Sequence, residues 1–434
     1  MKKIKCADCG GSASTNMYYD LHGNAICKTC APIYIECPQT GIKLHKSEAI
    51  EFDGKFYHQS ARESWLECSL SGNRTPFVAK HTVLTSDMDE EKIIACSREI
   101  QKHYAKCSKT NMLFKKEDGV DVDGTLFSKL GAAILANPIG TYHNDGRNNL
   151  TFMVSDKEKE EYAGDSLLPD GRKKRFFGVE IEAYVPRKFH KSEEYVKNIS
   201  RYFACESQKI LNKESVHARM EWDGSVDKGY ETIFMPMTKE YMREYKMSRR
   251  IWDIQKLGMY SFETRSCGLH VHVTKASLKP LQWWKINAFF AKCKKRIIAL
   301  SGRKEEQLKQ WAFIESEAQF LTKAENQPRK HTSSPTTNNP ERGDKYTAIN
   351  FKNSKTVEFR LFNGTLNGDR FMNTINFIDA LLDFSKDCGY SFFINSKPYE
   401  MWKAFMNYFK TKYPKSHKYI HQYVENEIKQ GIED

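Results

Sequence analysis

The stretch CGLHVHV at residues 267–273 has the clearest alternation of polar and apolar residues in the chain. Successive side chains of a β-strand point to opposite faces, so His270 and His272 lie on one face and the apolar side chains lie on the other. A strand of this kind has a hydrophobic core behind it and a polar surface in front. The heptapeptide therefore predicts a sheet with a candidate site on its polar face.

Three further stretches repeat this alternation with charged residues. FFGVEIEAYVP at 176–186 and TVEFRLF at 356–362 predict strands, and EWDGSVDKGYETIFMP at 221–236 predicts a turn followed by a strand. Four such stretches in one chain indicate that their polar side chains share a single site. The candidate residues of the three further stretches are Glu180, Glu182, Asp223, Glu231, Glu358 and Arg360.

The donor types in these strands suit a divalent metal ion. Carboxylates and imidazoles bind hard to borderline ions, and Mg²⁺ or Mn²⁺ held by several acids usually accompanies a phosphate ligand. An arginine two residues from an acid, as Arg360 is from Glu358, suits a phosphate that the metal also contacts. Each motif alone has a simpler interpretation, since Glu-x-Glu is common on solvated sheet faces, Glu-x-Arg forms salt bridges and Asp-Gly forms hairpin turns.

The motifs, taken in order, resemble those of the amidoligase family, which belongs to the glutamine synthetase-like superfamily of carboxylate–amine ligases and is common in fungi and phages. The resemblance covers about residues 175–390. The family usually has Arg-Tyr before the conserved Asn, whereas this chain has Lys345 and Tyr346, with Arg342 close by as a substitute phosphate contact. The motifs that carry the resemblance are Gly178–Glu182, Asp223–Ser225 with Glu231, Cys267–His272, and Asn350 with Thr356–Leu366.

The resemblance implies an α+β catalytic domain whose antiparallel sheet is lined with acids and flanked by helices. It also implies an ADP-forming ligase, which phosphorylates a carboxylate with ATP and lets an amine attack the acyl phosphate. The implied roles divide the candidate residues into four sets. These are Glu180, Glu358 and His270 for one Mg²⁺ or Mn²⁺; Glu182, Glu231 and Asp223 for a second; His272, Asn350, Arg342 and Arg360 for the nucleotide; and Arg360, His272 and Glu358 for catalysis.

A separate metal site is predicted near the amino terminus. Cys6 and Cys9 form one Cys-x2-Cys pair, and Cys27 and Cys30 form another. Four thiolates at this spacing suit a tetrahedral structural zinc ion, as in zinc ribbons and LIM-like fingers.

The pattern around this pair recurs along the first 136 residues. Cys6, Cys37 and Cys68 are evenly spaced, and Cys107 begins a fourth unit after an insertion around residues 85–92. Only the first unit keeps four ligands, and too few remain in the others to hold zinc. We therefore predict four tandem zinc-ribbon-like units of β-hairpins, three of them degenerate and held by apolar packing.

The predicted organisation is four finger units at 1–136, a linker at 137–174, the catalytic domain at 175–390 and a helical extension at 391–434. The polar, proline-broken segment 326–345 is interpreted as an active-site lid. Apolar periodicity predicts helices at 192–211, 238–257, 279–300, 304–323, 370–386, 396–413 and 417–431.

Charge and cysteine content bear on the partners and the location of the protein. The net charge is +13 and most of the excess follows residue 150, where it favours phosphates or acidic substrates. The nearly neutral cysteine-rich part argues against nucleic acid as a partner, without excluding it. Twelve cysteines, with no export signal and no long apolar segment, predict a cytoplasmic protein (host cytoplasm if phage-encoded) without a membrane partner.

Two other functions fit parts of the sequence. A metal-dependent nuclease or phosphoesterase also uses acids and histidines, but would not need the ligase motifs. A non-catalytic zinc-ribbon adaptor would carry a remnant of the ligase domain. The carboxylate and amine substrates themselves are not identifiable from the sequence, although a protein or peptide is one candidate. Cys267 is interpreted as a packing residue because no separate base accompanies it.

Overall fold

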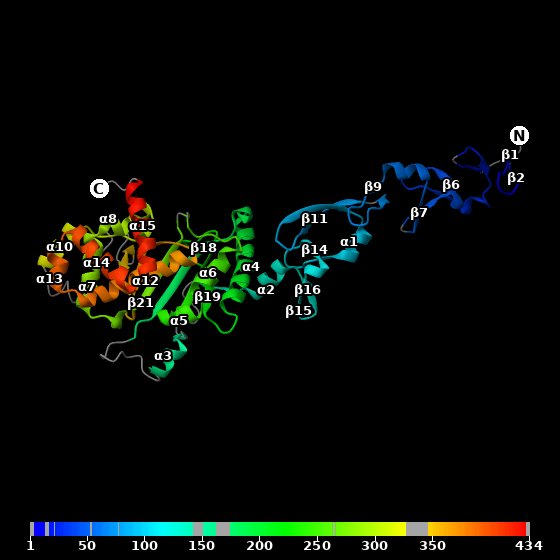
Figure 1. The fold of residues 1–434 in the computed structure, drawn as a ribbon. Coiled ribbons are helices and arrows are strands. Elements are labelled where there is room, and N and C mark those ends of the chain that lie inside the picture. The colour runs from blue at the N-terminus through cyan, green and yellow to red at the C-terminus, as the bar shows by residue number, and fades with distance from the viewer. Residues whose placement is uncertain are drawn as a thin grey trace. The chain divides into compact units, whose positions relative to one another are not determined.

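The computed structural model divides the chain into two compact units, Met1–Leu135 and Ala136–Asp434 (Figure 1). It describes residues 4–13, 17–20, 22–52, 54–76, 78–141, 151–161, 174–262, 264, 266–326 and 346–430. Arg342 and most of the predicted lid, residues 327–345, lie outside these ranges. No helix among the described residues is long and apolar enough to cross a membrane.

A seven-stranded sheet forms the centre of the second unit, in the order β17-β19-β20-β18-β21-β23-β22. All its neighbouring strands are antiparallel except β17 and β19. The sheet is thus antiparallel, as expected, apart from this edge, where a long connection lets the added strand run parallel to its neighbour. The strands are β17 (Ile139–Gly140), β18 (Phe177–Tyr184), β19 (Ala218–Glu221), β20 (Gly229–Met237), β21 (Gly268–Thr274), β22 (Ile349–Asn350) and β23 (Thr356–Asn363).

One face of this sheet is apolar and covered by helices. Phe359 of β23 is fully buried and lies against Trp283 and Phe290 of α7 (Pro280–Lys292). Tyr230 of β20 is buried on the same side, where its hydroxyl meets Ser207 Oγ of α4 (Glu193–Leu211) at 2.8 Å. The predicted fold class, α+β with a helix-flanked sheet lined by acids, is confirmed.

Helices α7, α12, α14 and α15 pack together beside the sheet (Figure 1). Three predicted helices are each divided in two, because the apolar periodicity continues across breaks such as the left-handed Lys246, whose φ is 55°. The remaining helices are α3 (Asp156–Glu161), α5 (Lys239–Glu244), α6 (Met247–Gln255), α8 (Lys294–Ser301), α9 (Glu305–Trp311), α10 (Glu317–Asn326), α12 (Gly368–Asp387), α13 (Tyr390–Asn395), α14 (Pro398–Lys412) and α15 (Pro414–Lys429).

The first unit consists of short hairpins joined by turns, with two helices, α1 (Ser97–His103) and α2 (Lys129–Ala136). The longest hairpin, β11 with β12, encloses part of the predicted insertion and also pairs with β14 in parallel. The strands are β1 (Ile4–Lys5), β2 (Ser12–Ala13), β3 (Tyr18–Tyr19), β4 (Ala25–Ile26), β5 (Tyr34–Glu36), β6 (Lys43–His45), β7 (Ile50–Phe52), β8 (Lys55–Tyr57), β9 (Leu66–Glu67), β10 (Arg74–Thr75), β11 (Ala79–Leu84), β12 (Glu90–Ala95), β13 (Tyr104–Lys106), β14 (Leu113–Lys115), β15 (Val120–Val122) and β16 (Thr125–Phe127).

Candidate functional site

Three glutamates lie side by side across neighbouring strands on the polar face of the sheet. Glu182 of β18 is paired in register with Glu231 of β20, and Glu231 is paired with Glu221 of β19. All three are buried, each less than 5% exposed. Like charges directly opposite one another destabilise a sheet, so this row requires positive charge in front of it.

Histidines and acids alternate across the next strands. Glu180 of β18 is in register with His270 of β21, and His272 is in register with Glu358 of β23. The β21–β23 register shifts between Leu269 and Val271, which is the mark of a bulge. On β23 the polar face therefore ends at Arg360, and the buried Phe362 that follows is paired with Leu269 on the core side.

His270 lies at the centre of this constellation. Its Nδ1 is 3.3 Å from Glu180 Oε2, 3.7 Å from Glu358 Oε1 and 4.0 Å from Glu231 Oε1, and its Nε2 is 4.0 Å from Glu182 Oε1. One imidazole thus borders four carboxylates that come from three different strands.

Both carboxylate oxygens of Glu358 already have partners. Arg360 Nη1 donates to Oε1 at 2.5 Å, and Asn350 Nδ2 donates to Oε2 at 2.9 Å. His272 Nε2 lies 3.2 Å from Glu180 Oε1 and 3.9 Å from Glu358 Oε1. The simple interpretation of Glu-x-Arg as a salt bridge therefore holds in this structure, and a metal ion at Glu358 would share the carboxylate with Arg360 and Asn350.

The Asp-Gly-Ser turn brings a fifth acid to the site. Asp223 follows the end of β19, and its Oδ1 accepts hydrogen bonds from the backbone N–H and the hydroxyl of Ser225, both at 2.6 Å. These bonds hold the turn and leave the other carboxylate oxygen available. Asp223 also lines the same cavity, of about 650 Å³, as the strand residues.

The cavity gathers every predicted site residue that the structure describes in this unit. These residues are Glu180, Glu182, Asp223, Glu231, His270, His272, Asn350, Glu358 and Arg360. Tyr346, which the sequence motifs included, also lines it. The motifs did not indicate its further lining residues Ser266, Arg303, Trp311, Lys352 and Asn353. Glu221 was missed as well, although its spacing from Asp223 could have indicated it.

Arg303 is the most informative of the missed residues. It is buried, and its Nε donates to the Phe362 carbonyl at 3.2 Å. A Cβ added to Gly268 would lie 2.6 Å from Arg303 Nη2 and 2.8 Å from His270 Nε2, so the glycine of CGLHVHV makes room for both side chains. Arg303 follows a helix end in a stretch without periodicity, and no sequence pattern distinguishes it from a surface arginine.

Burial and neighbouring charges favour the neutral form of two glutamates in the site and the charged form of one histidine. Burial, followed by the neighbouring carboxylates Glu180 and Glu182, raises the pKa of Glu231 well above its usual range. Burial also raises the pKa of Glu182. Burial alone would lower the pKa of His272, but the charges of Glu180 and Glu358 raise it to about 9. The site thus holds more negative charge than its own cations can stabilise.

The donor atoms suit one or more divalent cations. They form three overlapping groups whose ligand atoms lie within 4.8 Å of one another: Glu180, Glu231 and His270; Glu180, His272 and Glu358; and Glu182, Asp223 and Glu231. Oxygen-rich sets with an imidazole are typical of Mg²⁺ and Mn²⁺ sites. The third group is the set predicted for the second metal, whereas Glu358 is grouped with His272 beside Glu180.

Cys267 begins the strand but has no catalytic surroundings. It is 1% exposed, and burial, followed by the charge of Glu182, raises the pKa of its thiol. A buried thiol with a raised pKa is a poor nucleophile, which agrees with a packing role.

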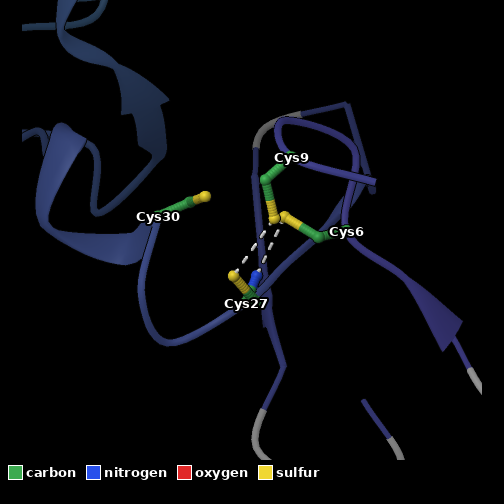
Figure 2. Close-up of side chains that lie close together, drawn as sticks. All are labelled: Cys6, Cys9, Cys27 and Cys30. Carbon is green, nitrogen blue, oxygen red and sulfur yellow. Dashed lines mark hydrogen bonds between the residues drawn. The ribbon is translucent and has the colours of Figure 1, made fainter. Parts of the chain in front are cut away.

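The four amino-terminal cysteines form a second candidate metal centre, in which their side chains turn toward one another (Figure 2). Their sulfur atoms all lie within 4.8 Å of one another, and Cys9 Sγ is 3.7 Å from Cys27 Sγ. Zn–S bonds of about 2.3 Å place the sulfurs of a tetrahedral site about 3.8 Å apart. Backbone N–H groups of Cys9 and Cys27 lower the pKa of Cys6 to about 6, which favours the thiolate that zinc binds.

In the predicted fourth unit, other groups stand at three of the four positions that are cysteines in the first unit. Burial would raise the pKa of Cys107, but hydrogen bonds from Ser128 and Thr110 lower it to about 7. These two residues stand where the first unit has Cys27 and Cys9. Gly131 stands where the first unit has Cys30, and a Cβ added there would lie 2.3 Å from Cys107 Sγ. Hydroxyl groups and close packing thus occupy the space that a zinc ion would take in the first unit.

Comparison with known proteins addresses the second unit. Residues 173–382 match the family described as "Putative amidoligase enzyme". The resemblance seen in the sequence motifs is thereby confirmed over this range. A search of curated proteins finds no match.

Solved structures add little to this finding. One similar structure is a crystal structure of the complex between prokaryotic ubiquitin-like protein Pup and its ligase PafA. The match has 9% sequence identity and a TM-score of 0.29, and it covers 59% of this chain and 64% of that chain, less than two thirds of its length. A similarity this low supports no argument about fold or function.

Metal binding by the acid-lined cavity should release protons. Because the pKa values of Glu182 and Glu231 are raised, these carboxyls hold protons at a higher pH than ordinary glutamates, and a metal ion must displace them. Calorimetric titration of Mn²⁺ in two buffers of different ionisation enthalpy should show proton release, and affinity should fall as the pH is lowered. Glu231→Gln should reduce the proton release. Binding enthalpies that do not depend on the buffer in the wild type would contradict the prediction that Glu182 and Glu231 hold protons that the metal displaces.

Elemental analysis of the purified protein should find one zinc ion per chain. Cys27→Ser should lose it because three thiolates bind zinc far more weakly than four. Cys37→Ser is the matched control, since Cys37 belongs to a degenerate unit and should not affect zinc content. Loss of zinc in the folded control would show that the second unit of the repeat also binds metal.

Proposed function

We propose that the acid-lined cavity catalyses ATP-dependent ligation of a carboxylate to an amine. The observation that carries the proposal is the set of five carboxylates, two histidines and an arginine that four neighbouring strands and one turn bring into a single cavity. Residues 173–382, which match the amidoligase family, contain all of them. The proposed reaction passes through an acyl phosphate, and Mg²⁺ or Mn²⁺ would supply the charge that neutralises the phosphates during transfer.

An apolar slot beside the acids suits the nucleotide base. This slot, of about 230 Å³, adjoins Glu180 and His272, and its apolar walls include Phe152, Phe176 and Ile233. The rings of Phe152 and Phe176 meet edge to face with centroids 4.9 Å apart. A base in the slot would place its phosphates near His272 and the acids.

Two cationic residues at the edge of the acids are assigned to the phosphates. Burial would lower the pKa of His272, but Glu180 and Glu358 raise it to about 9, so the imidazole is charged at neutral pH. Within the described part of the chain, Arg360 Nε has no hydrogen-bond partner, although Nη1 pairs with Glu358. Arg360 can therefore keep its pair and still donate to an anion. An arginine that stabilises a transferring phosphoryl group can contribute about 10³–10⁵ in rate.

Glu358 has the proposed role of connecting metal and phosphate. It is 5% exposed, lies opposite His272 in the sheet, and is bound by Arg360 and Asn350. The charges of Arg360 and His272 overcome the effect of burial and lower its pKa, so that it is ionised and able to bind a cation. Asn350 would orient this carboxylate, and its predicted contact with the nucleotide remains a proposal, as does that of Arg342.

Thermal stability with ligand tests the proposal without knowledge of the substrate. The full-length protein should gain about 2.7 kcal/mol of stability in its second unit with Mg²⁺ and a non-hydrolysable ATP analogue at about 100 times the dissociation constant. Glu358→Gln should lose most of this gain, because the neutral amide cannot bind the cation. Glu240→Gln is the control, since Glu240 is exposed on α5 and lies 3.7 Å from Arg243, outside the cavity.

The two other functions predict different results in the same assay. A nuclease or phosphoesterase would be stabilised by Mn²⁺ alone or by an oligonucleotide, and not by the ATP analogue. A non-catalytic adaptor would show no ligand-dependent gain in the wild type. Either result would contradict the ligase proposal.

A further inference from the structure

A second cavity adjoins the acid-lined one at the Asp-Gly-Ser turn. Its volume is about 900 Å³, and Asp223 and Gly224 line both cavities. Its other walls come from the start of α4 and from the turn that leads into β20. A volume of this size is at the upper end of ligand pockets, which measure about 300–1,000 Å³. It can therefore hold several residues of an extended chain.

The charge of this cavity is opposite to that of the acid-lined cavity. Four cationic residues line it, Lys191, Lys197, Arg201 and Lys228. Two of its three acids already have partners, since Glu193 pairs with Lys197 at 2.7 Å and Asp227 accepts a hydrogen bond from Tyr184. The third is Asp223, which the acid-lined cavity shares. The pocket thus offers positive charge to a ligand beside a negatively charged site.

Arg201 is the cation best placed to bind an anion. Its Nε and Nη1 donate to the amide oxygens of Asn137 and Asn198 at 3.1 and 3.0 Å, and its guanidinium lies 5.7 Å from the ring centre of Trp222. These neighbours hold the side chain in place but are uncharged. Within the described ranges, no carboxylate forms an ion pair with it.

The pocket also has an apolar part. Trp222 is half-buried, and Val196 and Val226 are buried beneath the charged residues. A free phosphate or another small inorganic anion would use none of this surface. A chain that carries several carboxylates together with aliphatic carbon would use both the apolar part and the cations.

We propose that this basic pocket binds the carboxylate substrate as an acidic peptide, whose reacting carboxylate passes the Asp223–Gly224 turn into the acid-lined cavity. The inference rests on the proposed ligase function, because only that reaction requires a carboxylate substrate to enter the acid-lined cavity. The apolar slot for the base lies at the other end, beside Glu180 and His272. The amine substrate carries positive charge when it is protonated, and the lysines would repel it. Arg201 and Lys228 contact the further carboxylates and determine specificity.

Fluorescence anisotropy of a fluorescein-labelled hexaglutamate tests the pocket directly. The full-length wild-type protein should bind this peptide without nucleotide or metal, and binding should weaken as salt is raised. Arg201→Gln and, independently, Lys228→Gln should each weaken it about tenfold. Lys209→Gln is the charge-matched control, because Lys209 lies on the same helix, is exposed and pairs with Glu206 outside the pocket.

Three outcomes would overturn the assignment. The first is equal affinity of the wild type and both pocket variants for the peptide, with melting temperatures showing that the variants are folded. The second is equally tight binding of a labelled hexathymidylate, which would make the pocket a general polyanion surface. The third is loss of ATP-analogue binding in Arg201→Gln, which would show that the basic pocket is the nucleotide site.

The peptide assay and the nucleotide assay fail independently. Loss of peptide binding in Arg201→Gln, with the nucleotide-dependent gain in stability retained, supports the substrate pocket. Peptide binding in a protein that shows no nucleotide-dependent gain would contradict the ligase function and leave the pocket intact.

Discussion

The repulsion among Glu182, Glu231 and Glu221 is the constraint on which the second unit depends. Strand pairing places these carboxylates side by side in a buried row, and burial of uncompensated charge is costly. Part of the compensation comes from within the chain, through His270, Arg303 and Arg219, whose Nε lies 3.3 Å from Glu221. Burial, followed by the neighbouring carboxylates, raises the pKa of Glu231, and burial also raises the pKa of Glu182, so protonation relieves part of the repulsion. A bound cation would complete this compensation and would link the stability of the sheet to the chemistry of the cavity.

The apolar face of the sheet packs against helices, and the polar face carries the candidate site. Behind the strands, residues such as Phe359 and Tyr230 pack against α7 and α4 and hold the strand register. Register matters because a slip of one residue would turn the acids toward the helices. In front, the same register sets which carboxylate faces which imidazole. The geometry of the site is thus a direct consequence of core packing on the opposite face.

The sequence predicted those site residues that lie at every second position along a single strand. Alternation along single strands was sufficient to identify Glu180, Glu182, His270, His272, Glu358 and Arg360. It could not predict how strands pair, and so it missed the row that includes Glu221 and the bulge after Arg360. Arg303 was missed because only tertiary contact with Glu182 and Gly268 distinguishes it. The divided helices were missed because the apolar periodicity of the sequence continues across breaks such as Lys246, whose φ is 55°.

Under the proposed function, the acid-lined cavity binds divalent cations together with a nucleotide. Anomalous diffraction from crystals grown with Mn²⁺ and a non-hydrolysable ATP analogue would locate both. We expect manganese peaks between Glu180, Glu358 and the histidines and between Glu182, Asp223 and Glu231, with the phosphates beside His272 and Arg360. Crystals that bind the nucleotide elsewhere, or that show no manganese at these carboxylates at millimolar concentration, would contradict the claim.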